Sequence, residues 1–243
     1  MGRIHTDKDI RFTIDNIIKH DFNSFNIDLM YGLPNQNIHD AVHDLQEALS
    51  FNPPHISWYQ LTIEPNTNFY NSTPKLPNDK TIYNIMQTGT ALLKKNNYVN
   101  YEISAFAKPN YYCKHNLNYW QYGDYLGLGP GAHSKITTII NNNFNIIRLV
   151  KPKSPKNYFY NTTYEQRILT QQEIIFEFML NNLRLKDGFF KKDFIHRTSF
   201  GLDCINNILD IAVNKKLLNI TTNKIKPTAL GRRFLNNLQE LFV

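Results

Sequence analysis

Along the first hundred residues, the spacing of hydrophobic residues predicts helices that alternate with strands. Apolar residues recur at helical spacing over residues 10–22, and Thr6 and Asp9 stand before them as a capping box. Residues 25–31 form a short apolar run that is closed by a Gly-Leu-Pro turn. This run is typical of a buried strand that ends in a loop.

The same alternation continues to about residue 105. A second helix is expected over residues 38–49, a second strand over residues 55–63, and a third helix after Asn78, which can cap it. Residues 99–105 then alternate apolar and polar, as in a half-buried strand. The order α-β-α-β-α-β predicts parallel strands joined by crossover helices. Three such strands leave two unprotected edges, which favours part of a larger barrel.

The periodicity lapses between residues 109 and 160, where the sequence is rich in aromatic residues and glycine. Beyond it, the pattern predicts helices over residues 171–183, 191–196 and 202–215, a hairpin over residues 218–225 and a last helix over residues 230–241. These elements indicate a winged-helix-like module, which can bind DNA or serve only in packing. The candidate recognition helix, residues 202–215, has basic residues only at its end, and this favours packing.

Composition says more about the cellular compartment of the protein than about the chemistry it performs. The formal net charge is +7, but the basic residues are scattered in short clusters, which indicates a solvated surface. The sequence shows neither a signal-peptide pattern nor a run of about 20 apolar residues. Its two cysteines, Cys113 and Cys204, stand in unrelated segments and predict a reducing compartment. We therefore expect a cytoplasmic protein with no membrane span.

Three carboxylates fall within or just beyond the expected strands: Asp28, Glu64 and Glu102. Functional groups of parallel α/β proteins gather at the carboxyl ends of strands, so each is a candidate to contact a ribose, a metal or an arginine. From spacing alone, Asp28 is as consistent with helix capping as with ligand contact. His39 and His43 stand four residues apart on an exposed helix face without a third ligand, so they do not indicate a zinc site.

Two further stretches carry candidate chemistry. His115 could ligate a metal or haem iron, with Tyr119 and Trp120 flanking a flat ligand. Alternatively, His115 and Asn116 cap local backbone while the rings pack in the core, and the residues alone favour this interpretation. Residues 127–134 are rich in glycine but match neither a P-loop nor a dinucleotide fingerprint, so taken alone they predict a tight turn.

Six stretches are more specific together than any of them alone. They are residues 25–34 (Phe-Asn-Ile-Asp-Leu-Met-Tyr-Gly-Leu-Pro), 55–67 (His-Ile-Ser-Trp-Tyr-Gln-Leu-Thr-Ile-Glu-Pro-Asn-Thr), 101–107 (Tyr-Glu-Ile-Ser-Ala-Phe-Ala), 115–120 (His-Asn-Leu-Asn-Tyr-Trp), 123–134 and 231–242. Together they resemble the HemW-type haem chaperones, relatives of oxygen-independent coproporphyrinogen III oxidase within the radical SAM superfamily. The resemblance runs in order along essentially all 243 residues.

This resemblance implies an α/β fold class and three segments. Residues 1–108 would be the rear half of a partial (β/α) radical-SAM barrel, and residues 109–160 would complete its pocket. Residues 161–243 would form a mainly helical, winged-helix-like domain.

The resemblance also implies two cofactors that this chain is not equipped to use. Members of the family bind a [4Fe–4S] cluster through a Cys-x3-Cys-x2-Cys loop near the N-terminus, and one iron is left open for S-adenosylmethionine. The sequence lacks this loop and resembles the family from just beyond it, as a truncated member would. We therefore expect neither a cluster nor cleavage of S-adenosylmethionine, and hence no enzymatic radical chemistry.

A few site residues carry over by resemblance. Arg3 matches an arginine that contacts S-adenosylmethionine, and Asp28 matches an acid at the same ligand, although the pocket would be vestigial in this chain. Thr62 and His133 fall, less closely, where relatives line that pocket. His115 heads the His-Asn-x-x-Tyr-Trp motif thought to serve haem in this family, and the resemblance raises it above the capping interpretation.

Three functional hypotheses follow. The first is a HemW-like protein that binds haem and delivers it to recipient proteins. The second is one half of a split radical SAM protein whose cysteine-bearing N-terminal half is encoded separately. The third, disfavoured by the scattered charge, is a nucleic-acid-binding protein that uses residues 165–243.

Overall fold

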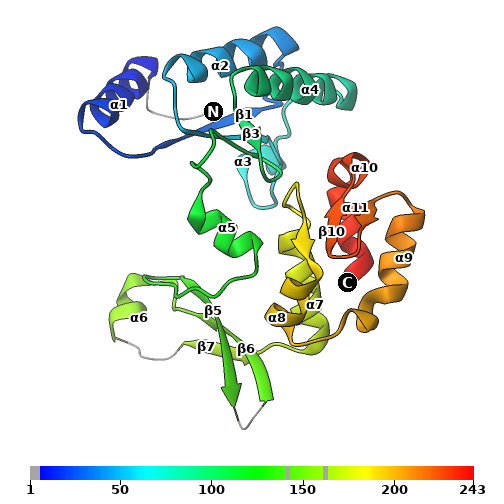
Figure 1. Ribbon diagram of the computed structural model, residues 1–243. Coiled ribbons are helices and arrows are strands. Elements are labelled where there is room, and N and C mark those ends of the chain that lie inside the picture. Colours follow the sequence, from blue (N-terminus) through cyan, green and yellow to red (C-terminus); the bar gives the residue numbers. More distant parts are fainter. Residues whose placement is uncertain (1–5, 141–142, 161–163) are drawn as a thin grey trace. The chain divides into compact units, whose positions relative to one another are not determined.

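The protein is described by a computed structural model for residues 6–140, 143–160 and 164–243 (Figure 1). The chain folds into two compact units, the first ending at Cys113 and the second beginning at Lys114. Each unit has its own hydrophobic core. No helix among the described residues is long and apolar enough to cross a membrane.

The first unit contains the three helices and the first two strands that the hydrophobic pattern predicts, together with one short helix that it does not predict. In chain order they are α1 (Asp7–Lys19), β1 (Asn26–Tyr31), α2 (Ile38–Ser50), β2 (His55–Gln60), α3 (Asn68–Asn71), α4 (Asp79–Lys95), β3 (Val99–Asn100) and β4 (Ala105–Ala107). Thr6 and Asp9 form the expected capping box of α1, and the side chain of Asn78 caps α4. These caps fix where both helices begin, which confirms their predicted start points.

The third predicted strand is wrong in its direction. The sheet has the order β1-β2-β4-β3, in which β1 and β2 are parallel but β4 runs antiparallel to β2 and to β3. Residues 99–107 therefore form a hairpin rather than one parallel strand. The side-chain amide of Asn100 donates hydrogen bonds to the carbonyls of Glu102 and Ala105, at 2.6 and 3.2 Å, and so turns the chain back.

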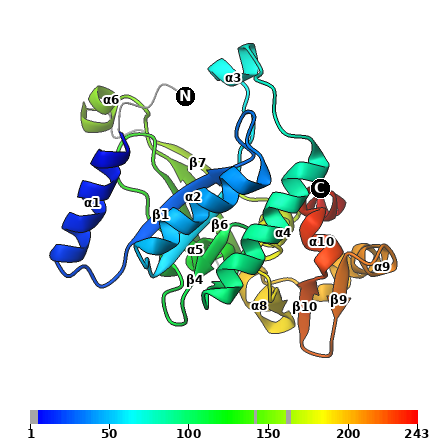
Figure 2. The same ribbon diagram turned by 90° about the horizontal axis from the view of Figure 1, so that it is seen from above.

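The core of the first unit lies between the sheet and two helices. Helices α2 and α4 lie side by side on the same face of the sheet (Figures 1 and 2). Leu45 of α2 and Ile85 and Leu93 of α4 are fully buried there against Ile56 and Trp58 of β2. This packing holds β1 and β2 rigidly, so the polar side chains on these strands have fixed positions.

The second unit contains two small sheets and a helical core. Its elements are α5 (Lys114–Trp120), β5 (His133–Ile140), β6 (Asn143–Val150), α6 (Pro155–Tyr160), β7 (Glu165–Ile168), α7 (Gln171–Asn182), β8 (Phe189–Phe190), α8 (Lys191–Thr198), η1 (Leu202–Ile205), α9 (Asn206–Asn214), β9 (Leu218–Ile220), β10 (Lys224–Pro227), α10 (Ala229–Arg233), α11 (Leu235–Gln239) and η2 (Glu240–Phe242). The C-terminal helices and the β9–β10 hairpin match the winged-helix-like pattern, and β8 adds a third strand to that hairpin.

The region in which periodicity lapses is more regular than expected. Strands β5, β6 and β7 form an antiparallel sheet, and eight residue pairs join β5 to β6. Tyr122 and Ile146 share one core with Phe178 and Phe194 of the following helices. These residues therefore share a unit with the C-terminal segment, and the boundary between the two units lies between Cys113 and Lys114. The three segments 1–108, 109–160 and 161–243 stay a prediction.

Candidate functional site

The structure locates three of the four residues that were assigned to an S-adenosylmethionine-like pocket. Asp28 is exposed on β1, Thr62 is exposed two residues beyond β2, and His133 is exposed at the start of β5 in the second unit. Arg3 lies outside the described residues. Among the described residues of the first unit, no hydrogen bond or ion pair joins Asp28 to Thr62, and His133 belongs to the other unit. Their role at such a pocket stays a prediction.

A row of hydrogen-bonded side chains runs from Asp28 into the first unit. The amide nitrogen of Asn26 donates to Oδ1 of Asp28 at 2.7 Å, which leaves the amide oxygen of Asn26 to accept from Nδ1 of His55 at 2.5 Å. Nε2 of His55 lies 2.7 Å from the hydroxyl of Tyr101, and that hydroxyl accepts from the main-chain nitrogen of Cys113 at 3.2 Å. The sequence pattern missed this row, because only the register of β1 against β2 brings Asn26 beside His55.

These contacts assign the proton on His55. Nδ1 faces an acceptor, so it carries the hydrogen, and Nε2 accepts from the Tyr101 hydroxyl. Burial raises the pKa of Tyr101 to about 12, which keeps that hydroxyl protonated and able to donate. Burial lowers the pKa of His55, and the nearby charge of Asp28 opposes this only partly. His55 is therefore held neutral in the fold.

The lowered pKa of His55 gives a stability that depends on pH. A group whose pKa falls on folding contributes stability above its unfolded pKa, here about 6.5, and loses it as the pH falls. We expect the free energy of unfolding to decrease between about pH 7.5 and 5, and His55→Gln to flatten this dependence. Denaturant titration in a Trp120→Phe background, in which Trp58 reports on the first unit, measures it. An unchanged pH dependence in His55→Gln would contradict the assignment, and the exposed His39→Gln is the matched control.

The other two strand-end carboxylates, Glu102 and Glu64, show no contact that indicates a ligand site. Glu102 is buried in the β3–β4 turn, where its Oε1 accepts hydrogen bonds from the main-chain nitrogen and the hydroxyl of Ser104 at 3.1 and 3.3 Å. It stabilises the hairpin. Glu64 is exposed in the loop after β2, and its main-chain carbonyl accepts from Thr67.

His115 occupies the second position of α5 and is exposed to solvent. Its ring packs edge-on against Tyr119, one helical turn later, with 4.8 Å between the ring centres. Neither ring nitrogen forms a hydrogen bond with another described residue, so the structure gives no support to the capping interpretation. An exposed imidazole with uncommitted nitrogens is available to ligate a metal.

The ring of His115 begins a row of aromatic side chains that is anchored in the second core. Tyr119 packs against Tyr125 with 4.3 Å between ring centres, and the hydroxyl of Tyr125 accepts from Nη1 of Arg148 at 2.6 Å. Glu177 holds Arg148 at 2.5 Å in turn. Because Arg148 belongs to β6 and Glu177 to α7, the surface histidine is tied to rigid elements of the unit.

Glu177 contacts a second side chain in addition to Arg148. It also accepts a hydrogen bond of 2.9 Å from the hydroxyl of Tyr122, which is fully buried. The pKa of Arg148 is raised, because the hydrogen bonds and charge of Glu177 outweigh the opposing effect of burial. Trp120, which closes the His-Asn-x-x-Tyr-Trp motif, lies under Arg184, whose guanidinium carbon is 4.3 Å from the ring centre.

The glycine-rich loop of residues 127–134 packs against its own strand. A Cβ at Gly127 would lie 2.1 Å from the carbonyl oxygen of His133, so only glycine permits this close approach. An ion pair joins the two ends of the loop: Nζ of the buried Lys135 contacts Oδ1 of the exposed Asp124 at 2.8 Å and lies over the ring of Tyr122. The loop is thus a tight turn with fixed ends, as its glycines predict.

The described residues contain no cluster of three or more His, Cys, Asp or Glu side chains that could hold a metal ion. The two cysteines of the chain are free and belong to different units, Cys113 to the first and Cys204 to the second. This sequence therefore cannot supply the three thiolates of a [4Fe–4S] site. The residues present do not fit that group, and no step of chemistry is assigned to it.

Comparison with known proteins gives a consistent result. No family model matches the sequence. The chain is 41% identical over 244 residues to the "Heme chaperone HemW" of Haemophilus influenzae, covering 100% of this chain and 63% of that protein. It is also 41% identical over 244 residues to HemW of Escherichia coli, covering 100% of this chain and 64% of the relative. HemW of Buchnera aphidicola from Schizaphis graminum is 41% identical over 243 residues, with 99% and 63% covered.

Among solved structures, the coproporphyrinogen III oxidase HemN of Escherichia coli, described as a radical SAM enzyme, matches with a TM-score of 0.75 at 20% identity. The match covers 99% of this chain and 59% of that enzyme, and it concerns the fold alone. It confirms the predicted α/β fold class. The chain spans a little less than two thirds of the curated relatives it matches, and over that span its sequence is similar to the HemW-type haem chaperones.

Proposed function

We propose that this chain binds haem through His115 and hands it to other proteins, in the manner that the name of its relatives describes. The observation that carries the proposal is the exposed imidazole of His115, whose nitrogens contact no described hydrogen-bond partner. Imidazole is a common axial ligand of haem iron. Beside it, the rings of Tyr119 and Tyr125 offer flat apolar surface that is held in place by Arg148.

The proposed role is binding and delivery rather than catalysis. A chain with only Cys113 and Cys204 has too few thiolates for a [4Fe–4S] cluster, and without that cluster it has no source for the electron that cleaves S-adenosylmethionine. Asn26 and Asp28 are exposed polar side chains of β1, whereas His55 and Tyr101 behind them are buried. We assign no reaction to them. Haem is the cargo of the protein in this proposal, and the recipients of haem are proteins of unassigned identity.

The experiment is a haem titration of the purified full chain followed through the Soret band. We expect the native chain to give a saturable, shifted band, and His115→Ala to weaken haem binding at least about tenfold, because one iron–nitrogen bond is lost. His39→Ala is the matched control, since His39 is also an exposed histidine on a helix. A native chain that causes no band shift, or an equal loss in both variants, would refute the proposal.

A second candidate, one half of a split radical SAM protein, is favoured by the open edge of the first sheet. Strand β1 pairs with β2 alone among the described residues, so its outer edge presents main-chain groups that another strand can pair with. Helix α1 also exposes Ile10, Phe12 and Ile18, which a neighbouring element would bury.

Co-expression with the cysteine-bearing N-terminal part of a relative tests this candidate. We expect a stable complex if β1 accepts another strand, and loss of that complex when a charge is placed on α1 by Phe12→Asp. Failure of the two parts to associate would remove the split-protein hypothesis while leaving haem binding by His115 untouched.

The nucleic-acid hypothesis gains no support. Helix α9 has no lysine or arginine between Asn206 and Asn214, so the candidate recognition helix lacks the phosphate contacts that such helices make.

A further inference from the structure

An exposed apolar surface lies at the glycine-rich loop of the second unit. Leu126 and Leu128 on the loop are 74% and 87% exposed, and Phe159 and Tyr160 at the end of α6 are 77% and 83% exposed. Single exposed apolar residues are ordinary, but four large ones in two adjacent segments are not. We call Leu126, Leu128, Phe159 and Tyr160 the apolar tip.

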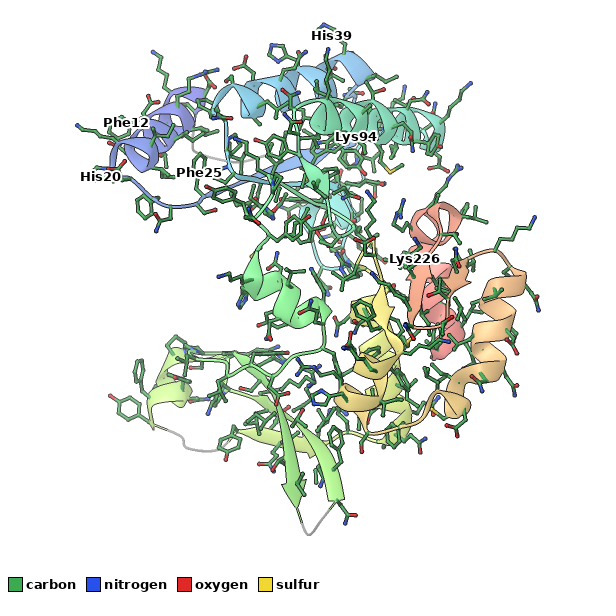
Figure 3. All side chains as sticks on the ribbon, viewed as in Figure 1. Phe12, His20, Phe25, His39, Lys94 and Lys226 are labelled. Atoms are coloured by element: carbon green, nitrogen blue, oxygen red, sulfur yellow. The ribbon has the colours of Figure 1, made fainter. Side chains whose placement is uncertain are left out.

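Hydrogen bonds hold the two segments of the apolar tip together. The main-chain nitrogen of Gly129 donates to the hydroxyl of Tyr158 at 3.2 Å, which ties the loop to α6. The nitrogen of Gly131 donates to the carbonyl of Pro152 at 2.8 Å, and that of Lys151 to the carbonyl of Ala132 at 2.9 Å. The apolar tip is therefore a fixed feature of the fold and not a pair of unrelated exposures. Figure 3 shows the side chains at this side of the sheet extending outward from α6.

The charged residues within the stretch from Tyr125 to Tyr164 are all basic, and an exposed acid stands at each end of it, Asp124 before it and Glu165 after it. The sequence has no Asp or Glu from Tyr125 to Tyr164, although it has five lysines and arginines there. Lys135 and Arg148 are paired with Asp124 and Glu177, which lie outside that stretch. The other three are Lys151, Lys153 and Lys156, none of which forms an ion pair with a described residue.

We propose that the apolar tip and these three lysines dock the protein on a membrane surface that carries anionic lipids. Side chains that remain three-quarters exposed protrude, and protruding leucine and aromatic side chains insert into the boundary between headgroups and acyl chains. The lysines beside them face the headgroups and are drawn to negative lipid. Leu126 and Leu128 project from a loop that both its Gly-Pro-Gly sequence and Tyr158 restrain, so little order is lost on insertion.

Other occupants fit these residues less well. An acidic protein surface or a nucleic acid would attract the lysines but would leave the four apolar side chains exposed to water. A haem would need walls around its ring, which protruding side chains do not provide. The docking surface is independent of haem binding by His115, so the two proposals can fail separately.

The test is co-sedimentation of the purified full chain with vesicles of phosphatidylcholine alone and of phosphatidylcholine mixed with an equal amount of phosphatidylglycerol. We expect binding to the mixed vesicles only, weakened by added salt. Leu126→Ser with Leu128→Ser should lower the partition coefficient about tenfold, and Lys153→Glu with Lys156→Glu at least as much. Circular dichroism verifies that each variant remains folded.

Two matched controls make the test decisive. Ile139→Ser removes an apolar side chain that is 73% exposed at the other end of β5, and Lys94→Glu with Lys95→Glu changes exposed lysines of α4. Neither should alter binding to the mixed vesicles. The proposal is overturned if the chain binds neither vesicle, if it binds both equally, or if a control lowers binding as much as its partner. It is also overturned if the lysine variant weakens binding while the leucine variant does not, since that pattern marks a general attraction to polyanions.

Discussion

Glu177→Ala is expected to destabilise the second unit by about 3–5 kcal/mol. The carboxylate of Glu177 accepts from Nε and Nη2 of Arg148 and from the hydroxyl of Tyr122, and both sides of the ion pair are more than four-fifths buried. Removing it leaves a guanidinium and a buried hydroxyl without their acceptor. Denaturant unfolding in a Trp58→Phe background, in which Trp120 reports on the second unit, measures the change.

Two further variants define this effect. Glu177→Gln retains an acceptor for Tyr122 and removes the charge, so it should fall between the native chain and Glu177→Ala. Arg167→Ala breaks the exposed ion pair between Arg167 and Glu173 and should change the free energy of unfolding by less than about 1 kcal/mol. If Glu177→Ala and Arg167→Ala lowered the free energy of unfolding equally, the buried ion pair would stabilise the protein no more than the exposed one, which would contradict this prediction.

Gly89→Ala is expected to destabilise the first unit by about 1–3 kcal/mol, although alanine is the better helix former. A Cβ at Gly89 would lie 1.9 Å from the ring of Trp58. That ring is only 3% exposed and is packed between Tyr31 and Phe106, so it cannot move aside. Denaturant unfolding followed through Trp58 in the Trp120→Phe background measures the loss.

Thr88→Ala, at the neighbouring exposed position of α4, is the control and should be neutral or slightly stabilising. Gly89→Ala should also lose most of its effect when Trp58 is replaced by leucine, because the two positions are in direct contact; circular dichroism follows the unfolding of these variants, which lack the Trp58 signal. A native-like stability of Gly89→Ala would contradict the packing of α4 on β2.

The sequence predicted the elements whose ends are set by local chemistry. Helices α1 and α4 begin at Thr6 and Asn78, and these side chains form caps that depend only on the following residues. The direction of β4 was not predictable in this way. A period of two along residues 99–105 indicates extended chain, but it does not distinguish one strand from a hairpin, which the side-chain amide of Asn100 decides.

The candidate site was predictable only in part. The sequence pointed to His115 and Tyr119 as candidates, and their rings meet one helical turn apart on α5. The anchoring of Tyr125 by Arg148 depends on the antiparallel sheet, which the sequence pattern missed. Its strands are rich in β-branched residues, but the adjoining asparagines and the glycine-rich loop obscured their alternation.

The most direct test of the central claim is the axial coordination of haem bound to the full chain, read by magnetic circular dichroism. Histidine ligation is predicted for the native chain and for His39→Ala, and its loss is predicted for His115→Ala. A spectrum that His115→Ala leaves unchanged, or one that shows thiolate ligation by Cys113 or Cys204, would contradict the account.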